Sequence, residues 1–133
     1  MKNFAIAAAL LALTSVPAFA ADPLVGTWKT KPDDNGHFGF VDIKPCGGAF
    51  CGTLVKAFGA DGQAMQSDNV GRRIVWDMKN QGGGHYGGGK VWSPDRDKTY
   101  TSKMDLKGDA VAVSGCVLGG MICRNGGTWT RVK

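Results

Sequence analysis

The sequence predicts an all-β domain, a small antiparallel up-and-down barrel of eight strands. Two features of its composition support this class: the 133-residue chain contains no glutamate, and its alanines are concentrated in the first twenty residues. Good helix formers are therefore scarce, while the strand formers valine, threonine, tryptophan and phenylalanine are frequent. The third observation is a pair of similar motifs, Gly26-Thr27-Trp28 near the beginning and Trp129-Thr130-Arg131 near the end. They indicate that the first and last strands meet.

Alternating apolar and polar residues, bounded by turn residues, define the expected strands. They cover residues 25–31, 38–44, 52–58, 72–78, 91–92, 98–106, 110–116 and 127–132. Connections of hairpin length favour an antiparallel meander, and closing such a sheet removes its exposed edges. The alternative is an open sandwich of the same strands. Six glycines within 80–89 predict a flexible connection or a wide turn there, with His85 and Tyr86 as its anchor.

Four residues near the chain ends are expected to be structural: Gly26, Trp28, Trp129 and Arg131. Trp28 would plug one end of the barrel, and the guanidinium of Arg131 would lie over its indole ring. Such a cation–π contact contributes ~0.5–2 kcal/mol, depending on burial. Gly26 would let the backbone approach closely at this closed end.

The first twenty residues have the pattern of a secretory signal peptide. A lysine at position 2 precedes an apolar run from Phe4 to Val16, and the segment ends Ala18-Phe19-Ala20. The apolar run is shorter than the ~20 residues that a membrane-spanning helix needs. We therefore expect cleavage after Ala20, a single mature domain at 21–133 and a periplasmic or secreted location.

The four cysteines are expected to pair locally, Cys46 with Cys51 and Cys116 with Cys123. Each pair flanks a short reversal, so the two thiols can lie opposite each other across a hairpin. An oxidising compartment favours disulfides. The alternative, a tetrathiolate zinc site, conflicts with the six residues between Cys116 and Cys123, because paired zinc ligands are usually two to four residues apart.

Several motifs resemble a bacterial exported family catalogued as domain of unknown function 2147. They are the Gly-x-Trp opening, Cys46 with Cys51-Gly52, Asp68-Asn69 followed by Arg72-Arg73, Gly88-Gly89 with Trp92 and Pro94, Thr99-Tyr100, Gly115-Cys116 and the closing Trp-x-Arg. The resemblance implies a lipocalin-like barrel and carries no established activity. Asn69 is followed by Val70 where the family often has proline, and the glycine cluster is richer than the family pattern. Both departures affect loops rather than the fold.

A ligand site in such a barrel would use inward side chains and the loop at its mouth. The inward candidates are Phe40, Leu54, Trp76, Tyr100 and Met104, and the mouth candidates are Leu118, Met121 and Ile122. The mouth residues lie in an apolar loop between Cys116 and Cys123. This loop would either fold over the barrel and close its core, or present an apolar lid or contact surface.

No arrangement typical of an enzyme or a metal site is present in the sequence. The two histidines of the chain, His37 and His85, lie far apart, and Gly-x-Ser-x-Gly is absent. The glycine run satisfies Gly-x-Gly-x-x-Gly, but a strand and Pro94 follow it instead of the helix that a dinucleotide site requires. We expect no catalytic residue, no cofactor and no metal.

The charge pattern restricts the expected partners. The net charge is +5, but the basic residues are scattered, which does not favour nucleic acid as a partner. The sequence therefore predicts a monomeric envelope protein that binds a small hydrophobic ligand. The alternative is a solid barrel that acts through its surface on an envelope protein or in a stress response.

Overall fold

The computed structural model describes residues 21–133, so the predicted signal peptide at 1–20 lies outside the described residues. Nine strands form one sheet. Their bounds are β1 Gly26–Lys29, β2 Phe38–Cys46, β3 Ala49–Phe58, β4 Ala64–Met65, β5 Arg73–Gly82, β6 His85–Ser93, β7 Lys98–Lys107, β8 Ala110–Val117 and β9 Ile122–Arg131. Among residues 21–133 no helix is long and apolar enough to cross a membrane.

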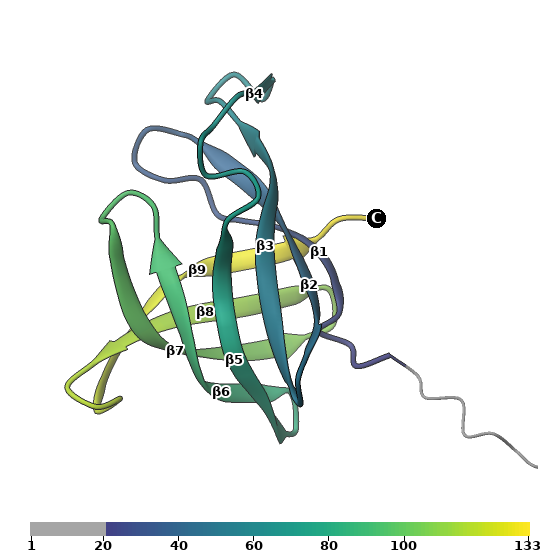
Figure 1. The fold of residues 1–133 in the computed structure, drawn as a ribbon, viewed down its shortest axis with the longest axis vertical. Helices are drawn as coiled ribbons and strands as arrows, with labels where there is room; N and C mark the ends of the chain where they lie inside the picture. Colours follow the sequence, from purple (N-terminus) through teal and green to yellow (C-terminus); the bar gives the residue numbers. More distant parts are fainter. Residues whose placement is uncertain (1–20) are drawn as a thin grey trace, which may run out of the picture.

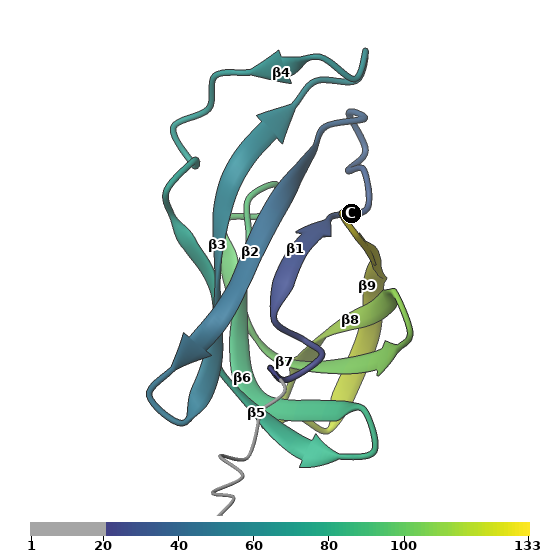
Figure 2. The same ribbon diagram turned by 90° about the vertical axis from the view of Figure 1, so that its right-hand side faces the viewer.

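The long strands form a closed antiparallel barrel, which confirms the predicted fold class (Figures 1 and 2). Each long strand pairs with the next long strand along the chain, so that β3 pairs with β5, and β1 closes the barrel by lying between β2 and β9. The two-residue strand β4 was not expected. It pairs with the far end of β3, where Ala57 and Phe58 extend above the barrel.

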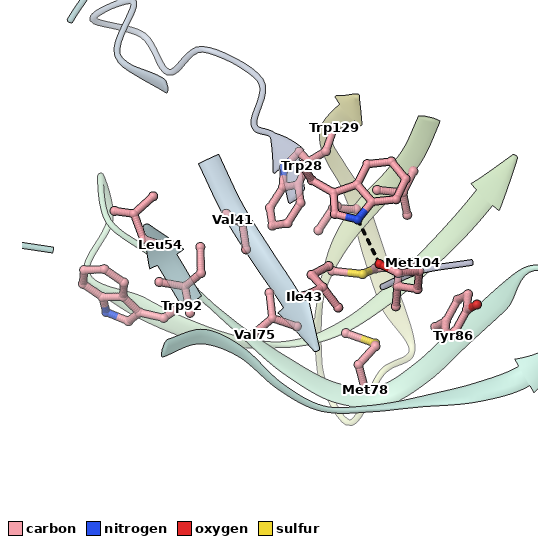
Figure 3. Close-up of a cluster of buried hydrophobic side chains, with 14 residues drawn as sticks. Trp28, Val41, Ile43, Leu54, Val75, Met78, Tyr86, Trp92, Met104 and Trp129 are labelled. Atoms are coloured by element: carbon pink, nitrogen blue, oxygen red, sulfur yellow. Dashed lines mark hydrogen bonds between the residues drawn. The ribbon is translucent and has the colours of Figure 1, made fainter. Parts of the chain in front are cut away.

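One end of the barrel is closed by the lead-in to β1. Leu24 and Trp28 are both fully buried, and the Trp28 indole N–H donates to the Leu24 carbonyl oxygen at 2.9 Å, the dashed line in Figure 3. Asp22 accepts hydrogen bonds from the Tyr86 hydroxyl at 2.5 Å and from the Asn80 side-chain amide at 2.9 Å. This end, from Asp22 to Trp28 with its partners, is the barrel floor.

The strand faces differ from the prediction in β2. Gly39, Val41 and Ile43 are buried, so the face that carries Phe40 points outward. The Phe40 ring instead lies 4.7 Å from that of Phe58, centroid to centroid. The bulky β-branched side chains occupy the interior because they pack beside Trp28 in the core (Figure 3).

A backbone irregularity changes the face of Trp76 in β5. Asp77 has a φ of 56°, in the left-handed region, which interrupts the two-residue alternation. Val75 and Met78 are consequently both fully buried, and Trp76 is only half-buried, packed against the core from outside. The expectation that Trp76 points into the barrel was therefore wrong.

The glycine-rich segment is largely strand, which corrects the predicted flexible connection. β5 continues to Gly82 and β6 starts at His85, with a tight turn between them. Tyr86 is buried in the core, and Gly89 faces the backbone of β5 so closely that a Cβ would lie 2.6 Å from the Trp76 carbonyl oxygen. The glycines allow two strands to approach where side chains would collide.

Both predicted disulfides are present. Cys46 and Cys51 join the ends of the β2–β3 hairpin with a Cα separation of 5.6 Å. Cys116 and Cys123 are directly paired residues of β8 and β9, with a Cα separation of 4.0 Å. Neither zinc coordination nor a free thiol remains among these four residues.

Candidate ligand-binding cavity at the barrel mouth

The end of the barrel opposite the floor contains a cavity of about 1000 Å³. We call this end the mouth. Four connections surround it: β1–β2, β3–β5 including β4, β6–β7 and β8–β9. In an antiparallel meander alternate connections lie at the same end, so these four meet at the mouth. The β5–β6 turn belongs to the floor end, and the glycine-rich segment therefore does not line the cavity.

The wall of the cavity is mainly apolar. Apolar side chains that line it from the strands include Phe38, Leu54, Ala57, Phe58, Ile74, Val91, Trp92, Tyr100, Val113 and Trp129. Half of these are buried residues of the core cluster, so their positions are fixed by packing beneath the cavity (Figure 3). A concave, mostly apolar site of this size is typical of small-molecule binding.

Polar and charged residues form the rim. Lys31, Arg96, Lys98 and Arg124 line it, and none of them forms an ion pair within residues 21–133. Three carboxylates also line the rim, Asp33, Asp34 and Asp95. Asp33 accepts hydrogen bonds from the backbone N–H groups of Asn35 and His37, and Asp95 accepts one from Ser93. Two of these carboxylates thus accept hydrogen bonds from their own loops. The cations are available to a ligand.

Trp92 is held rigidly at the edge of the cavity. The guanidinium carbon of Arg72 lies 3.3 Å from the centroid of the Trp92 ring, and the indole N–H donates to Asp97 at 3.0 Å. The Arg72–Trp92 contact brings the end of β5 against β6. Of the motif Asp68-Asn69 followed by Arg72-Arg73, Arg72 thus stacks on Trp92.

The structure brings together three of the eight predicted ligand residues. Leu54, Tyr100 and Ile122 line the cavity. Met104 is fully buried in the core nearer the floor, and Phe40 and Trp76 lie on the outer face. Trp129, expected only to be structural, also lines the cavity, and Trp92, Ile74 and Val113 were missed.

The apolar loop between β8 and β9 does not fold over the mouth. Leu118 and Met121 lie outside the cavity lining and are strongly exposed, so the expectation of a loop that closes the core was wrong. Val117 and Ile122, at the base of the loop, are half exposed and also line the cavity. The loop is an apolar projection at the edge of the mouth (Figure 1).

No second site with clear chemistry is found at the floor. His85 and Asp105 are cross-strand neighbours with Nδ1 and Oδ1 2.6 Å apart, and both are exposed. Burial, and secondarily the Asp22 carboxylate, raise the pKa of Tyr86, so this hydroxyl stays protonated and serves as a hydrogen-bond donor. Within residues 21–133 no group of three histidine, cysteine or acidic side chains is arranged to hold a metal ion.

Comparison with known protein families identifies the family of this chain. Residues 26–131 match the family model described as "Uncharacterized protein conserved in bacteria (DUF2147)". The chain belongs to this family. A comparison with curated proteins finds no match.

Among solved structures, the chain is similar to the protein HP1028 from Helicobacter pylori, whose structure is described as belonging to the lipocalin family. The TM-score is 0.67 at 19% sequence identity, and the match covers 85% of this chain and 84% of the other. At this identity the likeness concerns the fold: this DUF2147 chain is a lipocalin-like barrel.

Proposed function

We propose that this DUF2147 protein is an exported, non-enzymatic binding protein that holds a small apolar ligand in its mouth cavity. The observation that carries the proposal is the cavity of about 1000 Å³, with an apolar wall and a polar rim. Small eight-stranded barrels either are filled by their own side chains or hold one small ligand. This barrel is filled at its floor by Leu24, Trp28 and Met104, while its mouth half is hollow.

The two disulfides fit export to an oxidising compartment, and the residues just after the predicted cleavage site limit where the chain can be cleaved. Asp22 accepts the Tyr86 hydrogen bond, and Leu24 is fully buried. Cleavage after Ala20 retains both residues, whereas cleavage a few residues later would open the floor. N-terminal sequencing of protein recovered from a periplasmic fraction should give Ala21-Asp22-Pro23. A mature chain that starts beyond Leu24, or one that keeps Met1, would contradict this part of the proposal.

Ligand binding is tested by titrating the purified protein with laurate and with an anilinonaphthalene sulfonate dye. Trp92 and Trp129 line the cavity, so saturable one-to-one quenching of tryptophan fluorescence is expected. Val91 also lines the cavity, and Val91→Phe should fill part of it and weaken binding about tenfold. The adjacent Lys90 is exposed, so Lys90→Phe is the matched control and should bind like the wild type.

Equal binding by both variants, or no saturable binding to the wild type, would contradict the proposal. The alternative function, a barrel that acts only through its surface, predicts the second of these results. Native mass spectrometry of protein taken from its host provides an independent test, because a retained ligand is identified by its mass.

A further inference from the structure

Within residues 21–133, four of the seven exposed large apolar side chains belong to the β8–β9 loop and its base. Val117, Leu118, Met121 and Ile122 are 46%, 69%, 85% and 50% exposed, respectively. Isolated exposed apolar residues are ordinary, but four such side chains within six residues form a patch that requires an explanation. We call residues 117–122 the hairpin tip.

The hairpin tip is held in a fixed shape. The Cys116–Cys123 disulfide closes its base, and two backbone hydrogen bonds, Gly120 to Val117 and Met121 to Leu118, close its turn. Leu118 has a φ of 55°, in a region that is costly for a branched apolar residue. A flexible loop would relax this conformation and cover its apolar side chains. The tip instead presents them outward.

The net charge near the tip is slightly positive, because Arg96, Lys98 and Arg124 outnumber the carboxylates of Asp95 and Asp97 by one. From Ala110 to Thr130 the hairpin contains a single charged residue, Arg124, and no carboxylate. On the neighbouring mouth loop, the carboxylates of Asp95 and Asp97 accept hydrogen bonds from Ser93 and Trp92, whereas Arg96 and Lys98 have no ion-pair partner within the described chain. The whole sequence carries a charge of +5. An apolar projection beside unpaired cations complements a surface that is apolar below a layer of negative charge.

The tip is continuous with the cavity. Val117 and Ile122 are exposed on the tip and also line the mouth cavity. Apolar side chains therefore extend without a break from the hairpin tip to the cavity wall. An apolar molecule that moves from a surface bound by the tip into the cavity stays in contact with them.

We propose that the hairpin tip docks the protein on an anionic lipid bilayer. Leu118 and Met121 enter the boundary between headgroups and acyl chains, and Arg124 contacts headgroup phosphates. Such interfacial binding depends on both buried apolar surface and attraction to anionic lipid. The inference goes beyond ligand binding and does not depend on it, because docking is measured without any ligand in the cavity.

The test is flotation of the disulfide-bonded protein with vesicles of phosphatidylcholine alone and of phosphatidylcholine mixed with phosphatidylglycerol. We expect binding to the mixed vesicles, weakened by salt. Leu118→Asn/Met121→Ser should reduce the partition coefficient at least tenfold, and asparagine tolerates the left-handed backbone at position 118. Met65→Ser/Val70→Asn is the matched control, because these side chains are about 40% exposed elsewhere on the mouth end. The control should bind like the wild type.

Arg124→Gln tests the charge separately. It should weaken binding several-fold and reduce its dependence on salt, while Lys90→Gln, on the outer face of β6, should have little effect. Thermal unfolding of each variant verifies that the barrel is intact, since all of these side chains are exposed.

Three results would overturn the inference. The first is no binding of the wild type to mixed vesicles, and the second is equal binding by the tip variant. The third is a wild-type dimer in sedimentation that the tip variant abolishes without any change in vesicle binding. That result would assign the tip to contact between two copies of the chain.

Discussion

The guanidinium carbon of Arg131 lies 4.4 Å from the centroid of the Trp28 ring and joins the last strand to the first. Arg131 also donates hydrogen bonds to Asp109 at 3.0 Å and to the carbonyl oxygens of Val25 at 3.2 Å and Pro23 at 2.5 Å. A hydrogen bond and the charge of Lys133, followed by Arg131, lower the pKa of Asp109. One side chain thus fixes the closing strand, the aromatic floor and the lead-in segment.

Arg131→Ala should lower the free energy of unfolding by about 2 kcal/mol, because it removes packing on Trp28 and leaves backbone carbonyl groups without donors. Arg131→Lys should lower the free energy of unfolding by about half as much, since an ammonium group cannot reproduce the planar arrangement of guanidinium donors. Lys133→Ala is the control: it also removes a partner of Asp109, but at an exposed site. Urea unfolding measures all three. Dye binding at the mouth should be unchanged, and a loss of binding with normal stability would contradict the assignment of Arg131 to the floor.

Stability should decrease above about pH 10 because of Tyr86. Burial raises its pKa in the folded barrel, so the hydroxyl remains neutral while the same group in the unfolded chain ionises. The stabilising contribution of Tyr86 is therefore complete below the pKa that its hydroxyl has in the unfolded chain, and it is lost progressively as the pH rises above that pKa. Tyr86→Phe should cost about 1 kcal/mol at neutral pH through the lost bond to Asp22, and should flatten the alkaline decline.

Tyr100→Phe is the control for this experiment, since Tyr100 is the second of the two tyrosines and lies half-buried at the cavity. It should keep the alkaline decline of the wild type. If Tyr86→Phe retains that decline and Tyr100→Phe loses it, the assignment of the alkaline decline to Tyr86 is contradicted.

Gly89→Ala should destabilise the barrel by about 2–3 kcal/mol, because the new methyl group meets backbone atoms of β5 that cannot move independently. Gly87→Ala is a close comparison in the same strand: its nearest neighbour is the end of the flexible Gln81 side chain, 2.8 Å away. This variant should cost well under 1 kcal/mol. Equal melting temperatures for the two would show that the two strands separate easily at Gly89.

The two disulfides should contribute similarly to stability and differently to binding. Each closes a short loop, so replacing either pair by serine should cost about 2 kcal/mol. Only Cys116→Ser/Cys123→Ser releases the base of the hairpin tip, so only this variant should weaken dye and vesicle binding. Cys46→Ser/Cys51→Ser, at the floor end of β2 and β3, should bind normally at a temperature where both variants are folded.

The closed barrel was predictable because its signals are local and repeated. Strand alternation in β7 correctly placed Met104 inside, and the paired terminal motifs correctly predicted contact between Trp28 and Arg131. The cysteine pairs followed from their positions across hairpins. The strand and cysteine inferences depend on local backbone geometry, whereas the Trp28–Arg131 contact was inferred from the matching motifs near the two chain ends.

The cavity lining was less predictable because single residues change the face of a strand. A β-bulge at the buried neighbours Ile74 and Val75, together with the left-handed backbone at Asp77, turns Trp76 outward, and nothing in the sequence identifies these positions as irregular. The glycines between 82 and 89 were interpreted by composition, although they allow close strand contact. Counting alternate connections of the meander would have placed that segment at the floor and the rim loops at the mouth.

The pairing of β1 with both β2 and β9 has a consequence for folding kinetics. Trp28 and its partner Arg131 are 131 − 28 = 103 residues apart in the chain, so the contact that closes the barrel is among the most distant in sequence. Contacts between residues so far apart in sequence make folding slow, because the chain loses conformational entropy on closing the loop before the contact stabilises it. Until β9 is synthesised, β1 has one neighbour, and its other edge is open to strands of other molecules.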